Sequence, residues 1–229
     1  MPPTRLVVFD LDGTLVDSAR DLADAANALV AESGGRALSV EAVAAMVGDG
    51  AATLVRRALG AAGVSPQPPD ALDRFLAIYD DRLLIHTVVY DGMAQALECI
   101  ARGARLAVLT NKPARATGRV LAGLGLARWF GDAVVAGDGP FPRKPDPAGL
   151  HHLMASTGAT PNGTIIVGDS AIDLETARRA GTRVCLARWG FGFRIDELEL
   201  GAGEVLVRDP EELAKLILVG PPEGGPCKR

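Results

Sequence analysis

Short apolar runs, most of them separated by helix-length segments, constrain the fold of this chain more than any other feature of its sequence. The runs are rich in Val, Leu and Ile, as buried strands are, and they cover residues 5–9, 104–109, 132–136, 164–168 and 182–187. Segments long enough for helices lie between the later runs, at residues 91–102, 113–124, 146–157 and 170–180. Alternating strands and helices form a parallel sheet, because each helix crosses one face of the sheet on its way to the next strand. The sequence therefore predicts an α/β fold with a doubly wound parallel sheet.

The long interval from residue 17 to residue 88 breaks this alternation. It is rich in Ala, Leu, Asp and Arg at helical spacing and contains no convincing strand. Ser18 and Asp21 resemble a capping box at the start of its first helix, and the segment SPQPPD at 65–70 interrupts the helical pattern. We therefore expect a helical cap inserted after the first strand. The predicted organisation is an α/β core at 1–16 and 88–219, a helical cap domain at 17–87 and a flexible tail at 220–229.

Composition argues against several classes of protein. The formal net charge is -4 and the arginines are scattered, which disfavours a nucleic-acid-binding surface. No run of about 18 apolar residues is present, so no membrane span is expected. The cysteines lie far apart and lack a CxxC pair or a neighbouring His, which favours reduced thiols in a cytoplasm over disulfides or a zinc site. We expect a cytoplasmic monomer or homodimer that acts on a small molecule.

The first predicted strand ends in two carboxylates. Asp10 and Asp12 follow the apolar run LVVF, and residues two positions apart on an extended chain point roughly the same way, so both side chains can share one cavity. Gly13 then lets the chain turn away. In open α/β sheets, ligands bind in the crevice beyond the carboxyl ends of the strands. The pattern predicts a polar site at this edge of the sheet.

Further polar side chains occur where other predicted strands end or where a predicted helix begins. They are Thr110 and Asn111, Lys144 in the segment RKPDP, and Asp169 and Asp173 in the segment GDSAID. Each set alone has an ordinary structural explanation, such as a polar turn, a solvated lysine or a helix N-cap. A calcium-binding EF-hand does not fit the first motif, because that loop follows a helix rather than a strand. Four polar sets at one edge of one sheet are better explained by a shared site.

Carboxylates that converge in one crevice repel one another unless a cation lies between them. Oxygen ligands without a nearby His or Cys favour Mg²⁺, with Asp10 and Asp169 as the expected ligands. Asp10 is then a candidate nucleophile toward phosphorus, while Lys144 and the hydroxyl of Thr110 neutralise the phosphoryl charge. Asp12 is the candidate acid/base, which donates a proton to the leaving oxygen and later takes one from the hydrolytic water. These residue types predict phosphate-ester chemistry.

In these motifs the chain resembles the haloacid dehalogenase superfamily of phosphohydrolases over nearly its whole length. The matching segments, in the order typical of the family, are DLDGT at 10–14, LTNK at 109–112, RKPDP around Lys144 and GDSAID at 168–173. The resemblance implies a Rossmann-like core, an inserted α-helical cap and Mg²⁺-dependent hydrolysis of phosphomonoesters through a phosphoaspartate. It also implies that the main-chain carbonyl of Asp12 completes the metal ligands and that Asp173 supports the metal site.

Branches of the superfamily differ in the residues they require. The presence of Asp12 disfavours carbon-halogen chemistry, and the lack of any Lys before Lys112 disfavours phosphonoacetaldehyde hydrolase. Similarity to the phosphoglycolate phosphatase group lies in DLDGTLVDSARDL at 10–22, MVGDGAATLVRRAL at 46–59 and VYDGMAQAL at 89–97. We therefore expect 2-phosphoglycolate or a similar small phosphorylated metabolite as substrate. A sugar-phosphate phosphatase, pyrophosphate cleavage and a β-phosphoglucomutase-like phosphotransferase stay open.

The cap segment offers candidate contacts to such a substrate. Gly50 opens a predicted helix whose backbone N–H groups favour an anion, and Arg57, one heptad later, lies on nearly the same helix face. The alternative is that Arg56 and Arg57 are solvated helix residues. Thr14 and Asn111, through the motifs in which they stand, complete the predicted substrate-binding set.

A receiver domain of a signalling protein is the alternative from a different functional class. Receivers also gather acidic residues, a Thr and a Lys at strand ends and form a phosphoaspartate. They lack an inserted helical domain and an acid two residues after the phosphorylated Asp, whereas this chain has both features. Steady release of phosphate distinguishes a phosphatase from a receiver, which retains its phosphoryl group.

Overall fold

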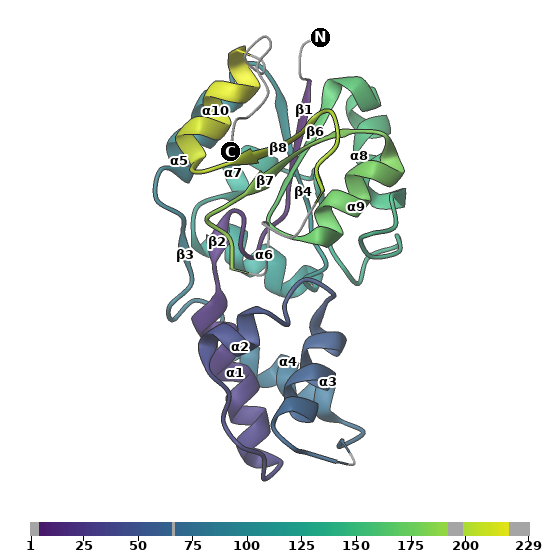
Figure 1. Ribbon diagram of the computed structural model, residues 1–229. Coiled ribbons are helices and arrows are strands. Elements are labelled where there is room, and N and C mark those ends of the chain that lie inside the picture. The colour runs from purple at the N-terminus through teal and green to yellow at the C-terminus, as the bar shows by residue number, and fades with distance from the viewer. Residues whose placement is uncertain (1–4, 66, 192–198, 220–229) are drawn as a thin grey trace.

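The computed structural model describes residues 5–65, 67–191 and 199–219. Within these residues, a six-stranded sheet with the order β5-β4-β1-β6-β7-β8 forms the centre of the upper half of the molecule (Figure 1). Its strands are β1 (Leu6–Phe9), β4 (Arg105–Leu109), β5 (Val134–Val135), β6 (Thr164–Gly168), β7 (Arg183–Ala187) and β8 (Glu204–Val207). Each pair of neighbours is parallel. The predicted α/β fold with a parallel sheet is therefore confirmed, and β8 is a strand beyond those that the sequence predicts.

Helices cover both faces of this sheet (Figure 1). They are α5 (Met93–Ile100), α6 (Ala114–Gly123), α7 (Ala127–Phe130), α8 (Ala148–Thr157), α9 (Ala171–Ala180) and α10 (Pro210–Val219), with a 3-10 turn at Pro161–Gly163 before β6. Alternate side chains of β1 enter different layers: Val7 and Phe9 pack in a cluster with residues of α5 and α10, and Leu6 and Val8 in a cluster with residues of α8 and α9. All four are fully buried. The sheet is therefore doubly wound, with β1 at its centre.

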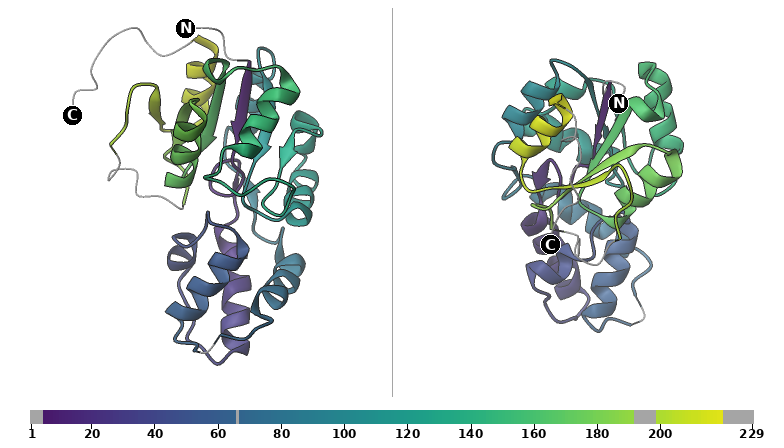
Figure 2. Two further views of the ribbon diagram at one scale, coloured as in Figure 1. Left: turned by 90° about the vertical axis from the view of Figure 1, so that its right-hand side faces the viewer. Right: turned by 45° about the horizontal axis from the view of Figure 1, so that its top comes forward.

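The cap lies below the carboxyl ends of the strands and appears as a separate lobe in Figure 2. It comprises α1 (Ala19–Glu32), α2 (Val40–Ala44), α3 (Ala51–Ala61) and α4 (Ala71–Arg82). The predicted break at 65–70 falls between α3 and α4. Apolar side chains such as Leu29, Leu59 and Phe75 fill the interior between these helices. A helical insertion after the first strand is thus present, while the domain limits at residues 17 and 87 stay a prediction.

A short ribbon joins the cap to the core. β2 (Val16–Asp17) and β3 (Val88–Val89) pair in antiparallel fashion where the chain enters and leaves the cap. The expectation that the interval 17–88 contains no strand is therefore wrong at its two ends. Two-residue strands are too short to produce a recognisable alternation in the sequence.

Ser18 and Asp21 do not form the predicted capping box. Ser18 stands before α1, but its hydroxyl donates to Asp12 Oδ1 at 2.6 Å rather than capping the helix. Asp21 is buried and accepts hydrogen bonds from the backbone N–H groups of His86 and Thr87 and from the Thr87 hydroxyl. The prediction is wrong because groups outside α1 bind both side chains: Asp12 binds Ser18, and the backbone of His86 and Thr87 binds Asp21.

The predicted tail at 220–229 lies outside the described residues. In the described part of the chain, none of the helices combines the length and the apolar composition that a membrane span requires.

Candidate active site

The strand order places three polar strand ends side by side. β1 lies between β4 and β6, and Asp10, Thr110 and Asp169 directly follow these three strands. The backbone N–H of Asp10 donates to the carbonyl of Val167 at 2.8 Å, and that of Thr110 donates to Val135 at 3.0 Å. The ladder of the sheet therefore holds these residues at one edge, and all three side chains are buried. The predicted convergence at the strand ends is confirmed.

Lys144 forms ion pairs with the candidate nucleophile Asp10 and with Asp173 of the segment GDSAID. Its Nζ lies 2.9 Å from Asp10 Oδ1 and 2.6 Å from Asp173 Oδ1. Burial raises the pKa of Asp10 to about 6, against the opposing effect of the Lys144 ammonium. Burial also works to lower the pKa of Lys144, but the carboxylates of Asp10 and Asp173 hold that pKa above its usual range. The lysine thus supplies a fixed positive charge beside Asp10.

Asp173 caps α9 and binds Lys144 at the same time. Its Oδ2 accepts hydrogen bonds from the backbone N–H and the hydroxyl of Ser170, at 3.1 and 2.5 Å, and its own N–H donates back to that hydroxyl. The neighbouring Gly168 has to lack a side chain, because a Cβ there would lie 2.2 Å from Asp173 Cγ. The N-cap explanation of GDSAID is therefore confirmed for Ser170, while the role of this segment at a metal site stays a prediction.

Asp12 has a different set of partners from Asp10, although the two residues line the same cavity. Its carboxylate oxygens lie 3.0 and 3.1 Å from Lys112 Nζ, and Oδ1 also accepts the hydroxyl of Ser18. Lys112 Nζ in turn donates to Tyr79 Oη at 2.6 Å. Burial works to lower the pKa of Lys112, but Asp12 and Tyr79 hold that pKa above its usual range. Asp12 therefore lies beside the acidic cluster of Asp10, Asp169 and Asp173, and the Lys112 ammonium is its separate positively charged partner.

The oxygen donors of the acidic cluster fit a hard divalent cation. Asp10, Asp169 and Asp173 each place a carboxylate oxygen so that the three atoms lie within 4.8 Å of one another. Two glycines lie so close to Asp169 that neither position has room for a side chain. A Cβ on Gly13 would lie 2.1 Å from Asp169 Oδ2, and a Cβ on Gly190 would lie 2.2 Å from Asp169 Cβ. Oxygen-only donors of this kind suit Mg²⁺. Both oxygens of Asp173 accept hydrogen bonds, from Lys144 and Ser170, and Asp10 and Asp169 stay the expected side-chain ligands.

Asn111 and Gly50, of the predicted substrate-binding residues, line the cavity. The side-chain amide of Asn111 donates to the carbonyl of Gly48 in the cap at 2.8 Å and to that of Lys144 in the core at 3.0 Å. Its Oδ1 is buried and has no hydrogen-bond partner among the described residues. Gly50 is the N-cap of α3 and has a positive φ of 88°, which favours glycine. Both residues therefore lie where the cap meets the polar edge of the sheet.

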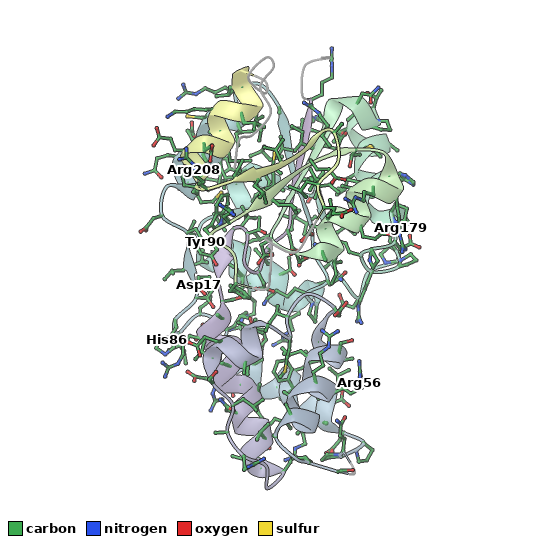
Figure 3. All side chains as sticks on the ribbon, viewed as in Figure 1. Asp17, Arg56, His86, Tyr90, Arg179 and Arg208 are labelled. Atoms are coloured by element: carbon green, nitrogen blue, oxygen red, sulfur yellow. The ribbon has the colours of Figure 1, made fainter. Side chains whose placement is uncertain are left out.

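Thr14 and Arg57 are not among the residues that line this cavity. Thr14 is fully buried, and its carbonyl accepts a hydrogen bond from Trp189 Nε1 at 3.0 Å. Arg57 forms an ion pair with Asp49 at 2.6 Å and donates to the carbonyl of Met46. Arg56 is exposed on the outer side of the cap (Figure 3). Arg57 thus braces the loop before α3, and its contact with a substrate stays a prediction.

The cavity has a polar wall from the core and an apolar wall from the cap. The cap contributes Leu22, Val47, Ala51, Leu54, Phe75, Leu76 and Tyr79. The core contributes the strand-end residues together with Lys112, Pro113 and Ser170. A cavity with few polar groups converging on one wall is typical of a small-molecule site. The reacting groups of a bound ester are therefore expected at the sheet edge, with the leaving group toward the cap.

Comparison with known proteins assigns the chain to a family. The family model described as haloacid dehalogenase-like hydrolase matches residues 7–187. This chain belongs to that family. The sequence motifs and the parallel sheet with its helical insertion agree with the assignment.

Relatives of this haloacid dehalogenase-like hydrolase are similar over most of their length. The plasmid phosphoglycolate phosphatase of Cupriavidus necator is 38% identical over 218 residues, which cover 94% of each chain. The phosphoglycolate phosphatase of Rhodospirillum rubrum is 43% identical over 196 residues, covering 82% of this chain and 80% of the relative. The crystal structure of a Haemophilus somnus protein described as a predicted phosphoglycolate phosphatase superposes with a TM-score of 0.77 and 30% identity, covering 83% and 88% of the two chains. The resemblance seen in the sequence is confirmed.

Sequence analysis of this haloacid dehalogenase-like hydrolase assigns no role to Lys112 or Tyr79. Lys112 stands inside the motif LTNK, just past the end of β4, so a signal for its position was available. Tyr79 lies on an amphipathic helix, where an aromatic residue is ordinarily explained by packing. Only the placement of the cap over the core brings its hydroxyl to Lys112.

Proposed function

We propose that this haloacid dehalogenase-like hydrolase cleaves phosphate monoesters through an aspartyl-phosphate on Asp10, and that its substrate is 2-phosphoglycolate. The observation that carries the proposal is the buried Asp10 carboxylate with the Lys144 ammonium 2.9 Å away, in a cavity that also contains Asp12. Action on a small phosphorylated metabolite follows from this site. The cytoplasmic location and the monomeric or homodimeric state stay predictions.

Two displacements at phosphorus complete the reaction. In the first, an Asp10 oxygen attacks phosphorus, the bond from phosphorus to the ester oxygen breaks, and Asp12 gives its proton to the leaving oxygen. In the second, water attacks the phosphorus of the aspartyl-phosphate and gives a proton to Asp12. The bond to Asp10 breaks, and inorganic phosphate and the free carboxylate result. Asp12 thus returns to its starting state.

Positive charge is required around the phosphoryl group throughout both steps. Lys144 neutralises part of the charge of Asp10 and of the entering dianion, and the Thr110 hydroxyl lies at the neighbouring strand end within the same cavity. Asp10, Asp169 and the main-chain carbonyl of Asp12 are the proposed ligands of Mg²⁺. When bound, Mg²⁺ supplies further charge neutralisation for the phosphoryl oxygens.

Support for 2-phosphoglycolate comes from the cap and from the relatives. The N-terminus of α3 opens at Gly50 inside the cavity, and the unsatisfied N–H groups of a helix start favour an anion such as a carboxylate. The curated relatives at 38% and 43% identity are named phosphoglycolate phosphatases.

The test is a panel of phosphate esters with and without Mg²⁺. We expect 2-phosphoglycolate to have a higher kcat/KM than glucose phosphates, with steady phosphate release that requires Mg²⁺. Asp10→Asn, which keeps the shape of the side chain, should abolish turnover while the circular dichroism spectrum stays unchanged. Retained hydrolysis by Asp10→Asn contradicts the role of the nucleophile. If a glucose phosphate has the highest kcat/KM, the proposed substrate is contradicted but the proposed reaction is not.

A further inference from the structure

We propose that Lys112 is a positioning residue for the acid/base Asp12, and that Tyr79 of the cap holds Lys112 in place. The inference rests on the proposed function, since it concerns how Asp12 is aimed at the leaving oxygen. It adds to the site a residue that acts through Asp12 and a cap residue that acts through Lys112.

The geometry around Lys112 leaves its ammonium group little freedom. Nζ lies 3.0 and 3.1 Å from the two oxygens of Asp12 and 2.6 Å from Tyr79 Oη. It also lies 4.6 Å from the centre of the Tyr79 ring. An ammonium group has three N–H donors, so these acceptors use its donor capacity. Lys112 is therefore committed to Asp12 and Tyr79 rather than poised to bind a ligand.

Burial strengthens the ion pair between Lys112 and Asp12. The side chain of Lys112 is 3% exposed and that of Asp12 11% exposed. A buried charge that loses its partner is costly, so the Asp12 carboxylate is held where Lys112 lies. Without Lys112, the Ser18 hydroxyl would be the remaining side-chain donor to Asp12 among the hydrogen bonds of the described residues. The orientation of the Asp12 carboxylate therefore depends on Lys112.

Tyr79 brings the cap into this arrangement. It lies on α4, is 3% exposed and stacks on Phe75 with ring centres 5.7 Å apart. That packing fixes the position of its hydroxyl above the core. Burial raises the pKa of Tyr79 to about 12, so the hydroxyl keeps its proton and serves as a neutral acceptor for Lys112. The cap thus reaches the acid/base through one buried hydrogen bond.

The next residue on α4 provides a matched comparison. Asp80 forms ion pairs with Arg115 and Arg119 of α6, so it also joins cap to core. These groups lie at the surface, with side chains 28, 79 and 45% exposed, and Asp80 does not line the cavity. Asp80→Asn therefore weakens contact between the lobes without touching Asp12 or Lys112.

The experiment compares three esters: 2-phosphoglycolate, 2-hydroxyethyl phosphate and p-nitrophenyl phosphate. The first two have alkoxide leaving groups that need a proton, and the second lacks the carboxylate. p-Nitrophenolate is a stable anion and departs without a proton. Because kcat/KM reports steps up to departure of the leaving group, later hydrolysis of the aspartyl-phosphate does not enter the comparison.

For Lys112→Met we expect kcat/KM to fall roughly 100-fold on both alkyl esters and less than about tenfold on p-nitrophenyl phosphate, within the range of general acid catalysis. Tyr79→Phe removes one hydrogen bond and should show the same pattern at about three- to tenfold. In the Lys112→Met background, Tyr79→Phe should have no further effect, because it acts through Lys112. Asp80→Asn should stay within about twofold of wild type on all three esters, as expected of exposed ion pairs.

Other outcomes overturn the inference. Equal losses on the three esters mean that Lys112 supports only the fold, and a loss confined to 2-phosphoglycolate means that it binds the substrate carboxylate. A loss for Asp80→Asn equal to that of Tyr79→Phe means that general contact between the lobes is responsible. If Lys112→Met does not fold, Tyr79→Phe decides by the same comparison of esters. An inactive wild type refutes the proposed function and the inference together, whereas an active wild type with an unaffected Lys112→Met refutes the inference alone.

Discussion

Asp21 clamps the chain where it returns from the cap, and its removal is expected to destabilise the protein strongly. Its carboxylate accepts the N–H of His86 at 3.0 Å and the N–H and hydroxyl of Thr87 at 2.8 and 2.7 Å. Asp21 and Thr87 are 1 and 3% exposed. These bonds tie the start of α1 to the second crossing between cap and core. His86 is exposed at the edge of this junction (Figure 3), so we expect water to satisfy its N–H after a substitution.

The expected magnitude follows from the donors that are left behind. Asp21→Ala strands the N–H and the hydroxyl of Thr87 in a buried position, at about 1 to 3 kcal/mol for each unsatisfied group. The free energy of unfolding should therefore fall by roughly 4 kcal/mol, a large part of the stability of a domain. Asp21→Asn keeps one acceptor oxygen and should lose about half as much. Urea unfolding followed by circular dichroism measures both variants.

Asp24, one turn later on α1, is the matched control for Asp21. Its side chain is 37% exposed and forms an ion pair with Arg20 at the surface. Asp24→Ala should change the free energy of unfolding by less than about 0.5 kcal/mol, because exposed pairs contribute little. If Asp21→Ala lowers the free energy of unfolding no more than Asp24→Ala does, the hydrogen bonds of Asp21 do not stabilise the junction between cap and core. The reasoning from burial is then refuted.

Further predictions concern the metal site and the cap. Mg²⁺ at about 100 times its dissociation constant should raise the unfolding temperature of the metal-free protein by roughly 5 to 10 °C, and Asp169→Asn should abolish this rise, which differential scanning calorimetry measures. Gly13→Ala, whose Cβ would lie 2.1 Å from Asp169 Oδ2 at a φ of 83°, should lose the Mg²⁺ response, whereas Gly125→Ala, at a φ of 68° with no atom within 4 Å, should retain it. Arg57→Ala should raise KM for 2-phosphoglycolate more than for p-nitrophenyl phosphate. Equal effects on the two esters would mean that Arg57 does not bind the substrate carboxylate and acts only through its contacts to Asp49 and Met46.

The central strands were predictable because their signals are local. β1 and β6 are short apolar runs buried on both faces, and each is followed at once by a carboxylate. The parallel arrangement then brings Asp10 and Asp169 to one edge without any knowledge of side-chain contacts. For this reason the candidate nucleophile and metal ligands could be named from the sequence alone.

Other elements could not be predicted because their patterns are weak or their partners are distant. β8 is an edge strand whose apolar run spans only three residues, 205–207, and Glu204, Val205 and Leu206 are only partly buried, so its signal in the sequence is weak. Ser18 and Asp21 have the spacing of a capping box, yet tertiary hydrogen bonds determine where both side chains lie. Local spacing predicts a local structure only when no distant partner binds the same atoms more strongly.

The arrangement of charge in the site explains why two lysines occupy separate positions. Lys112 pairs with Asp12, and Lys144 pairs with Asp10 and Asp173. After Asp12 has given up its proton, the four carboxylates, Asp169 included, and the two ammonium groups carry a formal excess of two negative charges, which a divalent cation would bring to zero. Lys144 contacts the nucleophile and Lys112 contacts the acid/base, so the two reacting carboxylates have separate cations. Each carboxylate can therefore change its charge during the reaction without altering the partner of the other.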